Sequence, residues 1–166
     1  HYKNRIPWLM LLMVSATFTQ LIIRGFEDAL SQVVLLTAYI PMIMDTGGNS
    51  GSQASVTIIR SISLGEIEFK DIFKVIFKEF RVALMCGATL ALLCFGKLML
   101  IDGLPAVGAV AIALTVSGTL FITVILAKFF GCTLPLLVKK IGLDPAVMAS
   151  PMITTVVDAL SLLVYF

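Results

Sequence analysis

The stretch VGAVAIALTVSGTLFITVILA, residues 107–127, decides the class of fold, because it carries no charged side chain over a length that can cross a bilayer. A hydrocarbon core roughly 30 Å thick takes about 20 residues of α-helix. A strand of a membrane barrel would alternate apolar and polar residues, whereas this stretch is apolar on every side. We therefore predict a transmembrane helix here and an all-α membrane protein.

The composition of the whole chain agrees with a membrane-embedded domain. Of its 166 residues, 59% are hydrophobic and 13% are charged, and the mean hydropathy is +1.05, far above that of a soluble domain. This length suits a single domain of a few crossings. A net charge of +2 without a basic, aromatic-interleaved patch argues against a nucleic-acid partner.

Charged residues mark the borders of the crossings, because an ionisable group costs about 2.5 to 3.5 kcal/mol at the centre of a membrane helix. Pro7 and Trp8 suit the first turn and the interfacial belt of the first crossing. Asp144 followed by Pro145 resembles an N-cap with proline at the first helical position of the last crossing. The five predicted transmembrane helices are residues 6–24, 29–60, 82–97, 105–130 and 145–166.

The distribution of positive charge predicts the orientation of the domain in a plasma (inner) membrane. Residues 66–81 alternate charged and apolar side chains at helical spacing, which predicts an amphipathic helix at the interface. With five crossings, only Arg24 and Lys97 lie opposite the other Lys and Arg residues, so the N-terminus is expected in the cytoplasm and the C-terminus outside. The residues assigned to the cytoplasmic side are Lys3, Arg5, Arg60, Lys70, Lys74, Lys78, Arg81, Lys128, Lys139 and Lys140.

Polar residues recur on one face of the predicted fifth crossing. Ser150, Thr154 and Asp158 follow one another every four residues, and Ser161 extends the same stripe. Polar groups inside membrane helices usually face a bundle interior or an aqueous path, and a carboxylate there needs a cation, a donor or water. A permeation role for Asp158 is the favoured interpretation, and a structural Asp that hydrogen-bonds a neighbouring helix is the alternative.

The second crossing carries a similar stripe within the run PMIMDTGGNSGSQAS, residues 41–55. Asp45, Asn49 and Gln53 lie at spacings of four and share one face. Gly47 and Gly51 have the GxxxG spacing that lets helices approach closely, and glycines also leave backbone carbonyls accessible to a hydrated ion. Together these features predict a polar pathway through the membrane.

Two motifs resemble the signatures of one family, the MgtE magnesium channels. The segment GGNSGSQ, residues 47–53, is similar to the second-helix signature of that family. The segment GLDPAVMASPMITTVVD, residues 142–158, is similar to its fifth-helix signature. The two motifs together, in a five-helix and positive-inside frame, are more specific than either motif alone.

The resemblance implies a Mg²⁺-conducting homodimer whose central pore is lined by the second and fifth helices of both subunits. It implies that Asp158 is the selectivity carboxylate, one from each subunit holding the ion through its water shell. Ser150 and Thr154 would then be accessory pore positions, and the stripe of Asn49 and Gln53 would line the same path. Mg²⁺ suits such a site, because it dehydrates reluctantly and is usually bound by only one or two carboxylates.

The chain departs from the family pattern in two respects. Members of the family usually carry cytoplasmic regulatory domains before the first helix, whereas this sequence opens at His1, so we expect a fragment. The second departure is Asp45, an acid that the family motif does not require. It is either a second ion site or a paired structural Asp.

Two other functions are open to the same residues. A buried Asp can bind a proton and glycine breaks allow alternating access, so a carrier that exchanges Mg²⁺ for Na⁺ or H⁺ is the stronger rival. Asp45 and Asp158 could also form the dyad of an intramembrane aspartyl protease, but the chain lacks the GxGD sequence of those enzymes, and we expect no enzymatic activity. Cys86, Cys94 and Cys132 form no CxxC pair and are expected to pack between helices.

Overall fold

The protein is all-α, as the sequence predicts. The computed structural model describes residues 2–32, 34–104, 108–142 and 144–166, and these residues form helices and turns without strands. The elements are α1 (Tyr2–Gly25), α2 (Glu27–Gln32), α3 (Val34–Thr37), α4 (Ile40–Ser63), the short 3-10 helix η1 (Phe69–Asp71), α5 (Ile72–Leu100), α6 (Ala109–Lys140) and α7 (Pro145–Tyr165).

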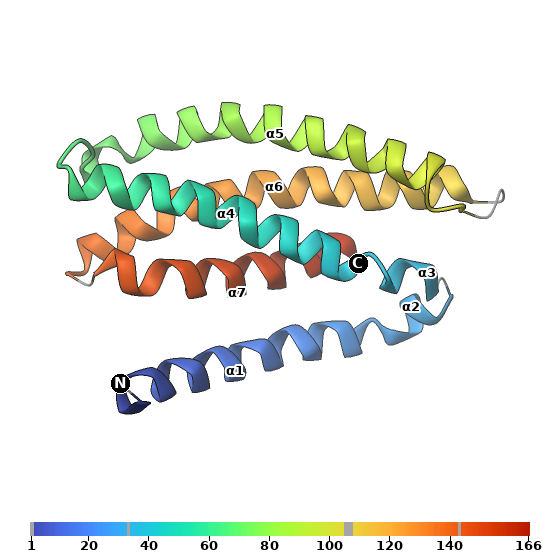
Figure 1. Ribbon diagram of the computed structural model, residues 1–166, viewed down its shortest axis with the longest axis horizontal. Helices are drawn as coiled ribbons and strands as arrows, with labels where there is room; N and C mark the ends of the chain where they lie inside the picture. The colour runs from blue at the N-terminus through green and yellow to red at the C-terminus, as the bar shows by residue number, and fades with distance from the viewer. Residues whose placement is uncertain (1, 33, 105–107, 143) are drawn as a thin grey trace.

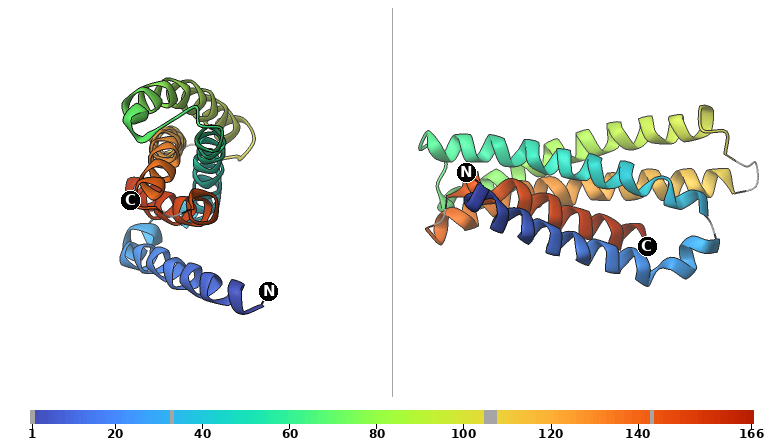
Figure 2. Two further views of the ribbon diagram at one scale, coloured as in Figure 1. Left: turned by 90° about the vertical axis from the view of Figure 1, so that its left-hand side faces the viewer. Right: turned by 60° about the horizontal axis from the view of Figure 1, so that its bottom comes forward.

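Helix α6 is the centre of the bundle. It packs against α4, α5 and α7, and α4 also packs against α7 (Figure 1). The end-on view of Figure 2 places α1 at the edge of the bundle beside α7, which is its main contact. Small and β-branched side chains such as Ala113, Val116 and Val124 are fully buried along α6 and let the neighbouring helices approach closely. Cys94 and Cys132 are buried in these helix contacts, as predicted.

Glycines on α4 and α6 permit the closest helix contacts. A Cβ atom at Gly47 would lie 2.6 Å from Thr123 Cγ2, and one at Gly51 would lie 2.7 Å from Ile153 Cγ2. Gly131 of α6 faces the backbone carbonyl of Gly51 directly. The close approach predicted from the GxxxG spacing is therefore confirmed, and it joins helices within one chain.

The predicted second crossing, 29–60, differs from the structure. The chain forms the short helices α2 and α3 before α4 starts at Ile40, and α4 runs to Ser63. Pro41 lies in the first turn of α4. A proline is favourable in that first turn, but its missing N–H and its ring prevent an earlier helix from continuing through it.

Two other predicted boundaries also differ. Residues 72–81, predicted as part of an interfacial helix that leads into the third crossing, belong to the same helix as that crossing, α5, because no Gly or Pro interrupts the chain there. Helix α6 runs to Lys140 rather than ending at 130, and it accommodates Pro135. It stops before Gly142, whose φ of 80° is the left-handed conformation that commonly follows a helix. The predicted start at 105 lies outside the described residues.

The surface of the bundle is suited to a membrane. Among the described residues, Phe69–Leu100 and Ala109–Lys140 are long and apolar enough to cross a bilayer by length and composition, and Leu9–Gly25 and Met152–Tyr165 are shorter apolar helices. Large apolar side chains are exposed on the outside, including Leu92 at 74% and Leu100 at 86%, which suits lipid rather than water. The count of five crossings, the orientation and the interfacial position of 66–81 stay predictions.

The burial of Lys128 is a feature that the sequence did not predict. The charge pattern assigns this residue to the cytoplasmic side, and within the bundle it is only 6% exposed. It lies in the body of α6, well before the end of the helix at Lys140. The helix extends beyond its apolar stretch, so the first charge after that stretch remains inside the bundle.

A polar cluster ties the α5–α6 turn to the start of α4. Lys97 Nζ lies 2.8 Å from Asp102 Oδ2, and the Tyr39 hydroxyl donates to the same oxygen at 3.1 Å. The hydrogen bond from Lys97 is the largest cause that holds the pKa of the Asp102 carboxyl below its ordinary value. Nearby, the Tyr165 hydroxyl donates to the Leu36 carbonyl at 2.8 Å, which fastens the end of α7 to the segment before α4.

We expect Asp102 to make the stability of the protein sensitive to acid. Its folded-state pKa lies below the unfolded value of about 3.9, so the stabilisation is present above that pH and is lost as the pH falls through the folded-state pKa. The ion pair is partly exposed, and solvent screening reduces the effect to about 0.5 kcal/mol. Thermal unfolding is followed in detergent from about pH 6 downward. The unfolding midpoint should fall less steeply with acid for Asp102→Asn than for the wild type.

Glu66→Gln provides the control for this titration. Glu66 is an exposed acid in the loop between α4 and η1, away from the Asp102 cluster. Its substitution should leave the acid-induced fall of the unfolding midpoint as in the wild type. Parallel curves for the wild type and Asp102→Asn would show that the Asp102 cluster does not contribute to acid sensitivity.

Candidate cation site

A groove between α4 and α7 brings together polar residues from the two predicted stripes. Its volume is about 510 Å³. The polar part is formed by Asp45 and Asn49 of α4 and by Thr154 and Asp158 of α7. Gly48 lines the groove where the two helices meet, and a Cβ atom there would be 3.5 Å from Thr154 Cγ2. Because glycine has no side chain, it leaves this part of the groove open.

The two carboxylates of the groove differ in their surroundings. Asp158 is half-buried and makes no hydrogen bond or ion pair with any residue that the structure describes. Asp45 is exposed and accepts a hydrogen bond from Asn49 Nδ2 at 3.1 Å. The two acids lie close enough to repel each other. A cation in the groove would relieve this repulsion and give Asp158 a partner.

The structure places the other predicted site residues elsewhere. Gln53 is exposed on α4 but does not line this groove, because it lies two turns, or about 12 Å, from Asp45 along the helix. Ser150 belongs to α7, and its side chain is outside the described residues. Ser161 is buried, and its hydroxyl donates to the Val157 carbonyl rather than facing the groove.

The apolar walls of the groove were not predicted from the sequence. They come from Ile40, Pro41 and Met44 around the start of α4 and from Ile23 near the end of α1. Pro41 could have been identified, since it precedes the polar stripe by one turn. Ile23 carries no such signal, because its position depends on how α1 packs in three dimensions.

The donor set suits a cation that keeps part of its water shell. No cluster of three or more His, Cys, Asp or Glu side chains occurs among the described residues. The groove instead offers the carboxylates of Asp45 and Asp158, with an amide and a hydroxyl beside them. Mg²⁺ is usually bound in this way, through one or two carboxylates and several retained waters.

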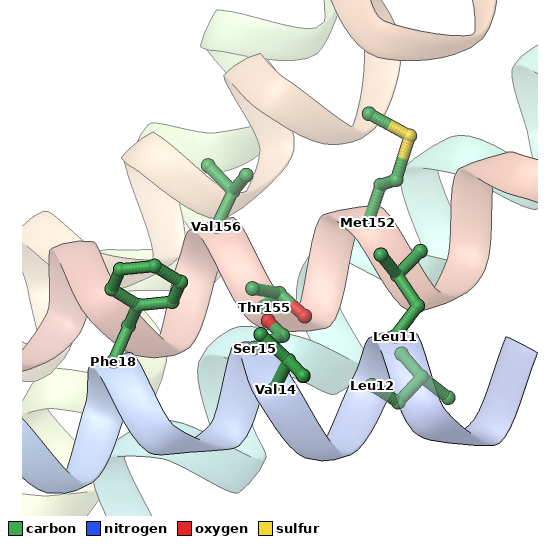
Figure 3. Close-up of a pocket in the computed structure, with 8 residues that line it drawn as sticks. All are labelled: Leu11, Leu12, Val14, Ser15, Phe18, Met152, Thr155 and Val156. Carbon is green, nitrogen blue, oxygen red and sulfur yellow. The ribbon is translucent and has the colours of Figure 1, made fainter.

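A second pocket, between α1 and α7, does not have this chemistry. Its volume is about 310 Å³, and it contains no charged side chain. Figure 3 shows the side chains that line it, which are Leu11, Leu12, Val14, Ser15, Phe18, Met152, Thr155 and Val156. These side chains are mostly apolar, and the pocket offers no carboxylate to a cation.

Comparison with known proteins agrees with the chemistry of the groove. Residues 40–166 match the MgtE family, which is described as a divalent cation transporter. The chain is 38% identical over 163 residues to the magnesium transporter MgtE of Bacillus subtilis, covering 98% of this chain and 35% of that protein. It is 35% identical over 165 residues to the magnesium transporter MgtE of Thermus thermophilus, covering 97% and 34%. The chain thus spans about a third of the length of these curated relatives.

Proposed function

The chain belongs to the MgtE family of divalent cation transporters, and from that premise we propose that it is a membrane domain that conducts Mg²⁺ through a channel. Its relatives are named as magnesium transporters. The observation that carries the proposal is the groove in which Asp45 and Asp158 face a shared space with Asn49 and Thr154. Asp158 is the selectivity carboxylate in this proposal.

The electrostatics of the groove support selection of divalent over monovalent ions. At an effective dielectric constant of 20 and a separation of about 5 Å, a divalent cation and one carboxylate attract each other by roughly 7 kcal/mol before desolvation is subtracted. A monovalent cation gains half of that attraction. The water shell that Mg²⁺ retains keeps the ion from being held too tightly to leave, which conduction requires.

A homodimer would complete the pathway. Asp45 and Asn49 are exposed along α4, and polar side chains that faced lipid tails would be costly. A second copy related by a two-fold axis would face these side chains with its own and enclose an aqueous path between them. We therefore propose that α4 and α7 of two subunits line the pore. The positive-inside pattern orients it with the N-terminus in the cytoplasm and the C-terminus outside the plasma membrane.

Flux measurements in proteoliposomes test the proposed function. We expect Mg²⁺ to enter down its own electrochemical gradient, at a rate that does not depend on an imposed Na⁺ or pH gradient. Flux that requires either gradient would assign the domain to the coupled carriers instead. Absence of both flux and divalent-ion binding, compared with protein-free vesicles of the same lipid, would contradict the proposal. Light scattering in detergent should give the mass of two chains.

A further inference from the structure

A second polar groove, bounded by α4, α5 and α6, contains the buried Lys128. Its volume is about 560 Å³. The polar lining includes Thr46, Ser50 and Gln53 of α4 and Thr89 of α5, with Lys128 contributed by α6. Helices α4 and α5 both pack on α6 but scarcely on each other, which leaves this space between them.

Lys128 has no partner of its own within the described part of the chain. The residue is only 6% exposed, and its side chain makes no hydrogen bond or ion pair with a described residue. The ammonium is not among the fully enclosed polar atoms that lack a partner, so the nitrogen reaches the groove that Lys128 lines. A positive charge in a confined groove attracts an anion.

The chemistry of the lining selects an anion rather than a cation. No Asp or Glu lines the groove. Its polar groups are an ammonium, hydroxyls and amides, which are hydrogen-bond donors, although the Thr89 hydroxyl already donates to the Met85 carbonyl. Glu79 of α5 is an acid near this region, because both it and Lys128 lie close enough to Cys132 to act on it electrostatically. Glu79 does not line the groove. A lysine with several neutral donors is typical of phosphate recognition.

The position of the groove along the helices points to a lipid as the source of the phosphate. Met85 and Thr89 follow Arg81, the last charge before the apolar part of α5, by one and two turns. Lys128 is the first charge after the apolar stretch 107–127 of α6. Both helices therefore place the groove just inside the predicted cytoplasmic border of the membrane, within reach of headgroups through a flexible lysine stem.

The groove also has the apolar wall that a lipid chain needs. Leu90 lines it, and Met85 at its rim is 73% exposed. We propose that this groove binds the phosphate of a phospholipid from the cytoplasmic leaflet, with Lys128 as its counter-ion and the hydroxyls of Thr46 and Ser50 as further donors. The proposal rests on α5 and α6 crossing the membrane and not on ion conduction.

The lipid would act as a structural link between two helices that scarcely touch. Asn49 lines this groove and the groove between α4 and α7, so α4 presents one face to the lipid site and an adjoining face to the candidate cation site. Occupancy would hold α4 in place beside α5. Removal of the phospholipid is therefore expected to lower the thermal stability of the folded chain.

The test compares two lipids that differ only in the headgroup. The purified full chain in detergent is titrated with dioleoylphosphatidylglycerol and with dioleoylglycerol, which has the same chains and no phosphate, and bound lipid is counted by native mass spectrometry. We expect retention of the phospholipid alone, with a rise in the unfolding midpoint. Lys128→Met should weaken phospholipid binding at least about tenfold, and Lys128→Arg by less than about threefold, because a charge-assisted hydrogen bond is lost only in the first.

Lys139→Gln is the matched control, since Lys139 is an exposed lysine on the same helix. It should bind the phospholipid as the wild type does. Equal binding by Lys128→Met and the wild type would overturn the proposal, as would equal binding of the two lipids. Protection by inorganic phosphate alone would assign the site to a free anion and also overturn it.

Folding and conduction are separated from lipid binding in this design. If Lys128→Met does not fold, the comparison of the two lipids on the wild type and the Lys128→Arg variant still decides the proposal. If Glu79→Gln destabilises the chain as much as Lys128→Met and neither changes lipid binding, Lys128 is the partner of Glu79 and the lipid site is excluded. A wild type that conducts no Mg²⁺ but retains the phospholipid would contradict only the proposed function.

Discussion

Asp158→Asn is expected to reduce Mg²⁺ flux into proteoliposomes by about ten- to a hundredfold at matched protein incorporation. The substitution removes an attraction of roughly 7 kcal/mol before desolvation, and a surplus of about 1.4 to 2.7 kcal/mol after it corresponds to that range. Asp45→Asn should have a smaller effect, because Asp45 is exposed and its carboxylate already accepts a hydrogen bond from Asn49. Flux is followed with a Mg²⁺-sensitive dye trapped in the vesicles.

The same variant should remain folded. Asp158 makes no hydrogen bond or ion pair with a described residue, so its neutralisation leaves no orphaned partner and removes an unfavourable buried charge. Asp102→Asn, which changes a carboxylate outside the groove, should conduct as the wild type does at neutral pH. Wild-type flux through Asp158→Asn, or loss of its folded state, would favour the structural interpretation of Asp158.

Gly131→Ala is expected to lower the free energy of unfolding by about 1–3 kcal/mol, as overpacking of a close helix contact does. The added methyl group would meet the backbone carbonyl of Gly51 and would lie 3.1 Å from Ala54 Cβ. No side-chain rotation can relieve a clash with backbone, so α4 and α6 must separate. Since α4 forms one wall of the candidate cation site, Mg²⁺ flux should fall together with the unfolding midpoint.

Gly118→Ala is the control for this prediction. Gly118 lies on the same helix, and a Cβ atom there has nothing within 4 Å. The substitution should leave stability unchanged or raise it by up to about 1 kcal/mol through helix propensity. If Gly131→Ala and Gly118→Ala unfold at the same temperature in detergent, the close contact of α4 with α6 does not limit stability.

The sequence predicted the components of the candidate site better than their grouping. Helical spacing identifies Asp45 and Asn49 as one stripe and Thr154 and Asp158 as another. That these four residues share a groove depends on the crossing of α4 and α7, which residue spacing within each helix does not specify. Gln53 shows the limit, since it belongs to the stripe on α4 but lies too far along the helix to reach the groove.

Lys128 shows the same limit for charge. A lysine at the end of an apolar stretch is normally assigned to the membrane surface. The length of α6 beyond that point and the packing of α4 and α5 around it decide that Lys128 is buried instead. Burial of a charge is a property of the neighbours that surround it, and those neighbours are distant in the sequence.

The sequence by itself determined that this protein is helical and suited to a membrane, because hydrophobicity over about 20 residues and helical periodicity are local properties of the chain. It also determined the family, which the motifs at 47–53 and 142–158 indicate and the match over residues 40–166 shows. Only the tertiary structure decided that Gly51 meets Gly131 and that the two acids share a groove. These features are contacts between separate helices, and their geometry follows from the packing of whole surfaces rather than from any one segment.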